Sequence, residues 1–203
     1  MKALIVSTGL ANTASVVAGL RRAGVSAHPS ADAQAIAAAP LVVMPGVGTF
    51  GAGMASLDST GLRQTLIQRI DAGRPTLAVC LGFQLLCEGS DESPQVEGLG
   101  LIPGRVTRFA AGLIVPQMGW NDVVPDDGCS LMTAGSAYFA NSYKLSGAPA
   151  GWRAAWAHHG GPFISALERG AVLACQFHPE LSGRWGQALI RRWIAAAREA
   201  SPC

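Results

Sequence analysis

Short apolar segments alternate with helical segments over the first half of the chain, and this alternation restricts the possible folds more than any other feature. The expected strands are residues 3–7, 25–28, 41–44 and 76–79, and the expected helices are residues 12–23, 32–39 and 57–72. Strands separated by helices of this length usually form a parallel sheet that helices cover on both faces. The sequence therefore predicts an α/β fold with a mostly parallel central sheet.

The second half has a different pattern, in which glycine and proline separate short strand-like segments. These segments are residues 106–109, 113–115, 137–143, 153–157, 163–168 and 171–177. They predict additional antiparallel strands in the C-terminal half. Residues 183–200 predict a final amphipathic helix with Leu189, Ile190 and Trp193 facing inward. Because the 203 residues contain no repeat and no linker, we expect one domain over residues 1–203.

Composition excludes several classes of protein. Hydrophobic residues make up 49% of the chain and charged residues 14%, which excludes a disordered chain. The net charge is only +2 and no basic stripe is present, so a nucleic-acid partner is not expected. No apolar run approaches the ~20 residues of a membrane span, and the N-terminus lacks the pattern of a signal peptide. We therefore expect a cytoplasmic protein that does not bind membranes.

The cysteines and histidines give no sign of a metal site. The cysteines stand at positions 80, 87, 129, 175 and 203, with no C-x-x-C pair, so neither a disulfide framework nor a zinc site is indicated. Adjacent His158 and His159 would point to opposite faces of a strand, and we expect them at the surface. His28 and the cysteines other than Cys80 are expected to be structural, with Cys87 packed on the helix that follows Cys80.

Cys80 stands between a predicted strand and a predicted helix. In the segment A-V-C-L-G at residues 78–82, small residues lie two positions before and after the cysteine, as in the sharp turn that presents a catalytic nucleophile. The N-terminus of the following helix would favour the thiolate. The alternative is a buried structural cysteine, which is common in apolar strands.

His178 and Glu180 form a second candidate pair in the segment Q-F-H-P-E at residues 176–180. Residues two apart in an extended chain face the same way, so Glu180 can hold one imidazole nitrogen while the other faces a nucleophile. The alternative is a histidine in an ordinary turn at Pro179. A cysteine, a base and a carboxylate together would complete a nucleophilic mechanism.

The segment P-G-V-G-T-F-G at residues 45–51 follows the third predicted strand and contains the pattern G-x-G-x-x-G. This pattern can bind dinucleotides, but here it does not follow the first strand, and Asp71, about 20 residues on, falls within a predicted helix. A glycine-rich turn can also direct backbone N–H groups at the oxyanion of a tetrahedral intermediate. An ordinary loop is the third possibility.

In this order and spacing, P-G-V-G-T-F, V-C-L-G-F-Q and Q-F-H-P-E resemble the class I (triad) glutamine amidotransferases. The segments P-Q-M-G-W-N at residues 116–121 and Y-F-A-N-S-Y at residues 138–143 narrow the resemblance to the glutaminase subunits of imidazole glycerol phosphate synthase. The resemblance covers nearly the whole chain. It implies the single-domain amidotransferase fold and the hydrolysis of glutamine to glutamate and ammonia in histidine biosynthesis.

The resemblance also implies roles for single residues. Cys80 would attack glutamine and form a thioester, His178 would transfer the proton to the leaving ammonia, and Glu180 would orient His178. The oxyanion region would comprise Gly46, Val47, Gly48 and Leu81. The residues that bind glutamine would be Gln84, Glu92 and Ser142. The heterodimer interface with a (β/α)₈ cyclase subunit, which receives the ammonia, would include Met118, Trp120, Asn121, Tyr138 and Asn141. No cofactor and no metal are implied.

Several positions depart from the family pattern. They are Ser7, Thr8 and Ala11 near the N-terminus, Leu181 where lysine is usual, and Gln117 and Asn141 where histidines are frequent. None of them is a member of the triad. Three alternatives stay open from the sequence: a glutaminase that serves another synthase, a regulatory subunit with an inactive triad, and a nucleotide-binding protein.

Overall fold

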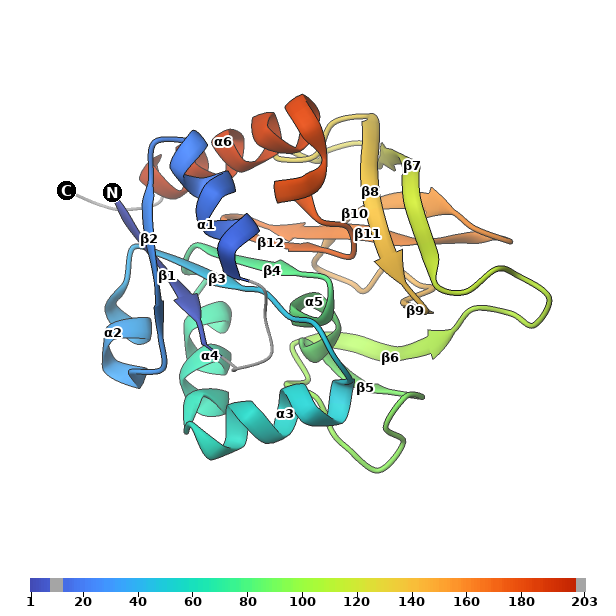
Figure 1. The fold of residues 1–203 in the computed structure, drawn as a ribbon, viewed down its shortest axis with the longest axis horizontal. Helices are drawn as coiled ribbons and strands as arrows, with labels where there is room; N and C mark the ends of the chain where they lie inside the picture. Colours follow the sequence, from blue (N-terminus) through green and yellow to red (C-terminus); the bar gives the residue numbers. More distant parts are fainter. Residues whose placement is uncertain (8–12, 200–203) are drawn as a thin grey trace.

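The computed structural model describes residues 1–7 and 13–199, and a nine-stranded sheet forms its centre (Figure 1). In spatial order the strands are β2 (Ser26–Ser30), β1 (Lys2–Val6), β3 (Leu41–Met44), β4 (Thr76–Val79), β12 (Val172–Cys175), β11 (Pro162–Arg169), β10 (Arg153–His158), β7 (Gln117–Pro125) and β8 (Gly135–Asn141). The strands from β2 to β12 pair in parallel, and those from β12 to β8 pair antiparallel. The predicted fold class is confirmed.

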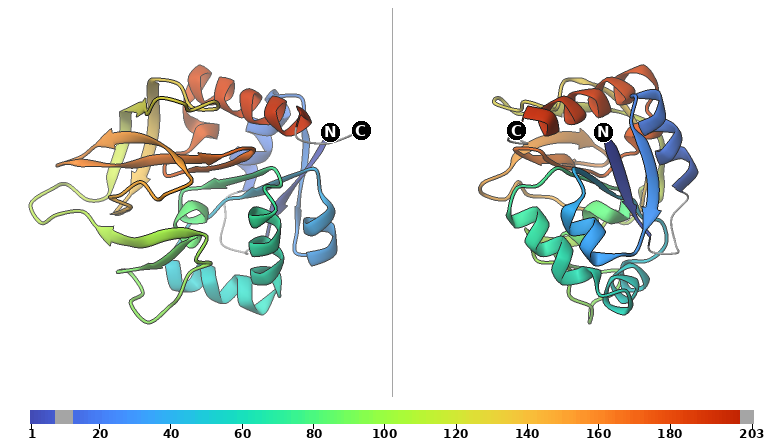
Figure 2. Two further views of the ribbon diagram at one scale, coloured as in Figure 1. Left: turned by 180° about the vertical axis from the view of Figure 1, so that it is seen from behind. Right: turned by 90° about the vertical axis from the view of Figure 1, so that its left-hand side faces the viewer.

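Helices cover both faces of the parallel part of the sheet (Figure 2). Helices α1 (Thr13–Arg22) and α6 (Gly183–Glu199) lie on one face, and α2 (Ala33–Ala38), α3 (Phe50–Ser59), α4 (Leu62–Asp71) and α5 (Leu81–Leu85) lie on the other. All four residues of β3 and of β4 are buried, as expected for strands that pack against helices on both sides. The inward face of α6 is confirmed, because Leu189, Ile190 and Trp193 are buried.

A smaller three-stranded sheet lies beside the central one. It contains β5 (Cys87–Ser90), β6 (Ile102–Arg108) and β9 (Tyr143–Lys144). Strand β9 comes just after β8, so the chain leaves the central sheet at Ser142 and joins the small sheet at Tyr143. The junction between the two sheets therefore brings the end of β8 close to α5, where Gln84 contacts the carbonyl of Tyr143.

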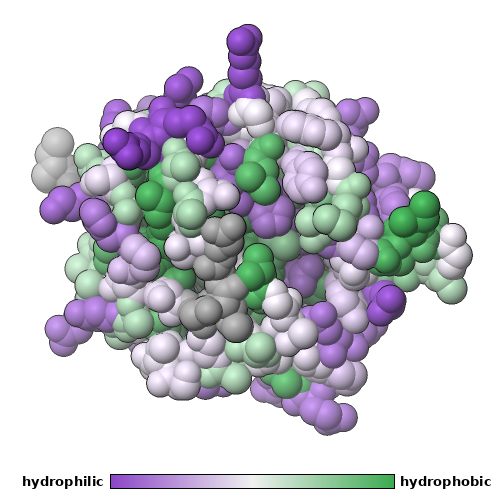
Figure 3. Space-filling view, in the orientation of Figure 1, coloured by the Kyte–Doolittle hydropathy of each residue, from purple (hydrophilic) through white to green (hydrophobic). Residues whose placement is uncertain are grey.

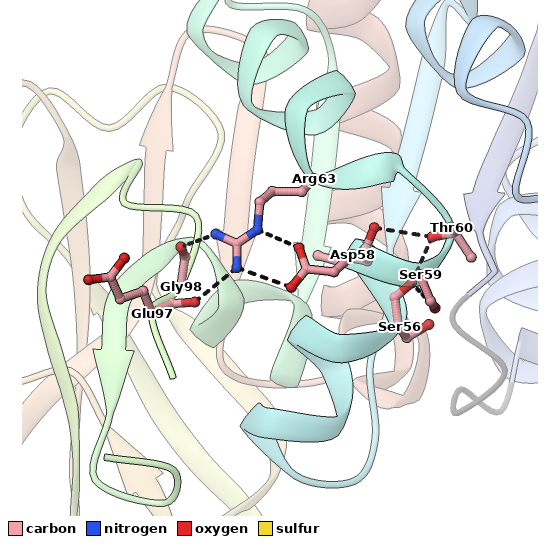
Figure 4. Close-up of polar contacts among 8 residues, drawn as sticks. Ser56, Asp58, Ser59, Thr60, Arg63, Glu97 and Gly98 are labelled. Carbon is pink, nitrogen blue, oxygen red and sulfur yellow. Dashed lines mark hydrogen bonds and ion pairs between the residues drawn. The ribbon is translucent and has the colours of Figure 1, made fainter. Parts of the chain in front are cut away.

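The prediction of one helix over residues 57–72 is wrong, because two helices share this segment. Helix α3 ends at Ser59 and α4 begins at Leu62, with Gly61 between them at φ +69°. Arg63 holds the corner: its guanidinium pairs with Asp58 at 2.6 Å and donates to the carbonyl of Gly98 at 3.0 Å (Figure 4). The helical spacing of apolar residues continues across the break and therefore did not reveal it. The break depends on the left-handed backbone of one glycine.

Other differences concern strands. Residues 113–115, predicted as a strand, form a loop, while β7 and β5 were not predicted. The loop between β6 and β7 projects from the body of the molecule, and its tip is hydrophobic (Figures 1 and 3). Ile114 in this loop is 85% exposed. In the part of the chain that the structure describes, no helix has both the length and the hydropathy to cross a membrane.

Candidate active site

Cys80 lies at the sharp turn between β4 and α5, with φ +54° and ψ −111°. Among residues 1–7 and 13–199 it is the one non-glycine residue with positive φ, a conformation that neighbouring structure must hold in place. The N–H of Cys80 donates to the carbonyl of Cys175 on β12 at 2.7 Å. A Cβ atom at Gly82 would lie 1.9 Å from the carbonyl oxygen of Met44, so this position requires glycine. The turn therefore has the geometry that the sequence predicted.

His178 and Glu180 follow the end of β12, next to β4. The imidazole Nδ1 lies 2.9 Å from Glu180 Oε1, and both side chains are largely buried, with exposures of 13% and 6%. The backbone of His178 is fixed as well. Its N–H donates to the carbonyl of Tyr138 at 2.9 Å, and its carbonyl accepts from the hydroxyl of Ser182 at 2.6 Å. Strand β8 and the turn after β12 thus set the position of the imidazole.

The electrostatics of His178 favour the imidazolium. Burial alone would lower its pKa, but hydrogen bonds to Cys80 and Glu180, together with the negative charges of both groups, raise the pKa to about 10. At neutral pH the ring is therefore protonated beside the sulfur. The ring can therefore act as a proton donor to a group that leaves from an atom bonded to the sulfur.

The other cysteines have a different environment. Cys87 and Cys175 are fully buried, and burial raises the pKa of both thiols well above the ordinary value. Burial, with contributions from Glu168 and Asp126, raises the pKa of Cys129 to about 11. Cys87 packs against α5 as expected, with its sulfur 4.0 Å from the carbonyl of Phe83. Among these cysteines, only Cys80 lies beside a histidine base.

A cavity of about 230 Å³ opens at Cys80 and His178. Its volume is below the range of pockets for drug-sized molecules and matches a ligand of amino-acid size. Its walls contain most residues of the predicted oxyanion and glutamine sites: Val47, Gly48, Leu81, Gln84, Glu92 and Ser142. Gly46 lies behind them, where a Cβ atom would come 2.8 Å from Leu81 Cβ. Residues from five separate segments of the sequence thus meet at one site.

Glu92 occupies the N-terminus of α3. Its Oε2 accepts from the N–H of Phe50 at 2.6 Å, and the neighbouring Ser93 hydroxyl accepts from Gly51 at 3.0 Å. In a dinucleotide-binding loop this helix terminus would hold the pyrophosphate. A carboxylate already in that place would repel phosphate, so the arrangement argues against the dinucleotide alternative.

The structure adds residues to the site that the sequence analysis did not assign. Gln176 Nε2 lies 3.8 Å from the sulfur of Cys80, and Tyr143 and Ala140 line the cavity. Gln176 could have been found, because it precedes His178 by two positions and so faces the same side of an extended chain. The role of Ser182, by contrast, depends on a turn that no sequence pattern announces.

The residues predicted at the partner interface fall into two groups. Met118 and Trp120 on β7 are 67% and 60% exposed, and the Trp120 ring meets the ring of Tyr138 on β8 edge to face. The Asn121 side chain donates to the carbonyl of His158 at 2.9 Å. Asn141 differs, because it is 4% exposed and lines the cavity. Of the positions near the N-terminus that depart from the family pattern, Thr8 and Ala11 lie outside the described residues.

Comparisons with known proteins identify the family of the chain. The family model "Glutamine amidotransferase class-I" matches residues 4–196. The chain is 43% identical over 194 residues to the imidazole glycerol phosphate synthase subunit HisH of Symbiobacterium thermophilum, an alignment that covers 94% of this chain and 92% of that protein. It is 41% identical over 196 residues to the HisH subunit of Streptococcus gordonii, with 94% of each chain covered.

A solved structure supports the fold alone. A crystal structure of a glutamine amidotransferase superposes with a TM-score of 0.77 at 19% identity, over 96% of this chain and 98% of that one. The family match and the two relatives rest on nearly the whole length of the chain. The chain therefore belongs to the class-I glutamine amidotransferase family, within the group of imidazole glycerol phosphate synthase HisH subunits.

Proposed function

We propose that the protein hydrolyses glutamine to glutamate and ammonia at Cys80. The observation that carries the proposal is the strained turn that places the Cys80 sulfur beside His178, whose other ring nitrogen is bound to Glu180 at 2.9 Å. The thiolate attacks the carboxamide carbon, and the C–N bond breaks as His178 transfers its proton to the leaving nitrogen. Ammonia departs and leaves a thioester. His178 then takes a proton from water, which attacks the thioester and releases glutamate.

The oxyanion of each tetrahedral intermediate forms on the side of the turn where two backbone segments meet. The segment that contains Val47 and Gly48 lines the cavity, and Leu81 begins α5 directly after the nucleophile. Backbone N–H groups of these segments are the donors we assign to the oxyanion hole. Removing one donor of this kind typically lowers the rate by about 10²- to 10³-fold.

Other residues in the cavity lining suit the amino-acid end of glutamine. Gln84 Nε2 is engaged by the carbonyl of Tyr143 and by Gln176, which leaves Gln84 Oε1 to accept from the substrate ammonium. Glu92 adds a negative charge to the same wall, and we assign Ser142 a further polar contact with the substrate. This distribution of charge selects for a free α-amino group.

The relatives are subunits of imidazole glycerol phosphate synthase. We therefore propose that the ammonia passes to a (β/α)₈ cyclase subunit in histidine biosynthesis, and that the exposed Met118 and Trp120 on β7 contact that subunit. Free ammonia in water at neutral pH is mostly ammonium, which is not nucleophilic. A heterodimer that excludes water along the route keeps the ammonia reactive.

The test is ammonia release from glutamine by the purified chain, alone and then with the cognate cyclase subunit and its nucleotide ligand. A strong increase on adding the partner would support both the glutaminase and the heterodimer. Release at background level in both samples would contradict the proposal, and would favour a regulatory subunit with an inactive triad. Increased release with a different synthase, and none with the cyclase, would identify the other partner class.

A further inference from the structure

Two buried glutamine side chains form a chain of hydrogen bonds that ends at the sulfur of Cys80. Gln84 Nε2 donates to the carbonyl of Tyr143 at 3.5 Å and to Gln176 Oε1 at 2.9 Å. Gln176 Nε2 lies 3.8 Å from Cys80 Sγ, within reach of a hydrogen bond to sulfur. Gln176 is fully buried and Gln84 is 6% exposed. The mechanism above uses neither amide N–H of Gln176.

The orientation of both amides follows from the first partner in this chain. A backbone carbonyl only accepts hydrogen bonds, so the Gln84 atom beside Tyr143 O must be its NH₂ group. The second hydrogen of that group is donated to Gln176, which must therefore accept with Oε1. Gln176 consequently turns its own NH₂ group toward Cys80. A donor, and not a carbonyl oxygen, faces the sulfur.

The strength of this contact depends on the charge of the sulfur. An N–H donated to an ionised group forms a stronger bond than one donated to a neutral group, and low local polarity strengthens it further. The contact therefore stabilises the thiolate more than the thiol or the thioester. It also acts from the segment after β12 that carries His178, because Gln176 precedes that residue by two positions.

We propose that Gln176 is a positioning residue that holds the Cys80 thiolate ready for attack, and that Gln84 keeps Gln176 in the required orientation. This inference rests on the proposed function, because it assumes that Cys80 is the nucleophile. It gives Gln84 two roles, one toward glutamine and one toward the sulfur. The two roles can be separated with a reagent that lacks an amino-acid end.

The experiment measures alkylation of Cys80 by iodoacetamide as a function of pH, with the Cys80 peptide followed by mass spectrometry. Gln176→Met removes the donor and keeps the volume. Gln176→Glu removes the donor and keeps an acceptor for Gln84, but it also places a carboxylate beside the sulfur, so Gln176→Met is the decisive variant. We expect iodoacetamide to alkylate Cys80 about three- to tenfold more slowly in both variants at neutral pH. The dependence of the alkylation rate on pH should move to higher pH. Wild-type rates and an unchanged profile in both folded variants would overturn the proposal.

The orientation step has its own test. Iodoacetamide makes no use of a glutamine-binding contact, so Gln84→Leu should slow alkylation only if Gln84 acts through Gln176. The double variant Gln84→Leu/Gln176→Met should then be no slower than the slower single variant. A wild-type rate of Cys80 alkylation in Gln84→Leu, or additive effects in the double variant, would contradict the role of Gln84.

A matched control comes from the neighbouring strand. Ser165 is fully buried on β11 and its carbonyl accepts the N–H of Gln176 at 2.8 Å. Ser165→Ala should keep the wild-type profile, and a shift equal to that of Gln176→Met would attribute the effect to packing and overturn the proposal. Glutamine turnover that survives Cys80→Ala would instead disprove the proposed function, so the two failures remain distinct.

Discussion

At the scale of single residues, the reactivity of the site comes from the contacts that the buried His178 makes with Cys80 and Glu180. His178 is buried, yet its contacts with Cys80 and Glu180 raise its pKa to about 10, which is opposite to the effect of burial alone. The proton that the leaving ammonia needs is therefore already on the ring at neutral pH. Cys80 is held for attack by a backbone conformation that a non-glycine residue rarely adopts.

The raised pKa of His178 predicts how activity and stability depend on pH. Because the folded-state pKa of His178 is raised from 6.5 to about 10, the stabilisation by its ion pairs is complete below pH 6.5 and is lost as the pH rises through about 10. Glutamine turnover should fall over the same upper range, since the proton donor is lost. The measurements are kcat and urea unfolding from pH 6 to 11.

Glu180→Gln provides the comparison, because it removes a charge that raises the pKa of His178 and keeps an amide oxygen in its place. Its upper pH limit should lie below that of the wild type. An equal limit in both proteins would show that Glu180 does not set the protonation of His178.

At the scale of elements, the site depends on how closely α5 approaches β3. Gly82 in the first turn of α5 faces the Met44 carbonyl so closely that any Cβ would overlap it. The segment of Gly46 packs against the same turn, so the oxyanion loop and the nucleophile turn support each other. Small residues here are a requirement of packing as well as of backbone conformation.

Gly82→Ala should therefore lower the free energy of unfolding by about 3 kcal/mol or more, because the chain must move to relieve the overlap. The measurement is urea unfolding at pH 7. Gly147→Ala is the control: its Cβ meets nothing within 4 Å, and we expect a change within about 0.5 kcal/mol. Equal stability of the two variants would mean that α5 can shift away from β3 at no cost.

The elements also show how far sequence reasoning reached. Strands β3 and β4 and helix α1 could be predicted because apolar runs and helical spacing are local signals. The proximity of Cys80 and His178 could be predicted because each follows a buried strand. The break at Gly61 and strand β7 could not be predicted in the same way. Strand β7 lacks the usual alternation of buried apolar and exposed polar residues, because the apolar residues Met118 and Trp120 are exposed.

At the scale of the whole molecule, the catalytic cavity lies beside an apolar strand surface. Asn141 lines the cavity and pairs in register with Gln117 on β7, next to the exposed Met118. Under the proposed docking on β7, ammonia would leave the cavity close to the partner subunit, and the exposed hydrophobic residues of β7 would be covered by it.

Trp120→Ala should weaken binding of the cyclase subunit by about 2 kcal/mol, or roughly 30-fold in Kd, because large aromatic residues dominate most interfaces. Titration calorimetry measures the change. Val124 is equally exposed at 60% and lies on the same strand, so Val124→Ala is the matched control and should bind within about threefold of wild type. A larger loss for Val124→Ala than for Trp120→Ala would place the interface elsewhere.

The central claim is that Cys80 produces the ammonia that the partner consumes. It is tested most directly by Cys80→Ala in complex with the cyclase subunit, assayed for synthesis first with glutamine and then with an ammonium salt. We predict that glutamine-dependent synthesis falls to background while ammonia-dependent synthesis stays at the wild-type rate. Glutamine-dependent synthesis that survives the substitution would show that the nitrogen is released elsewhere, and would contradict the account.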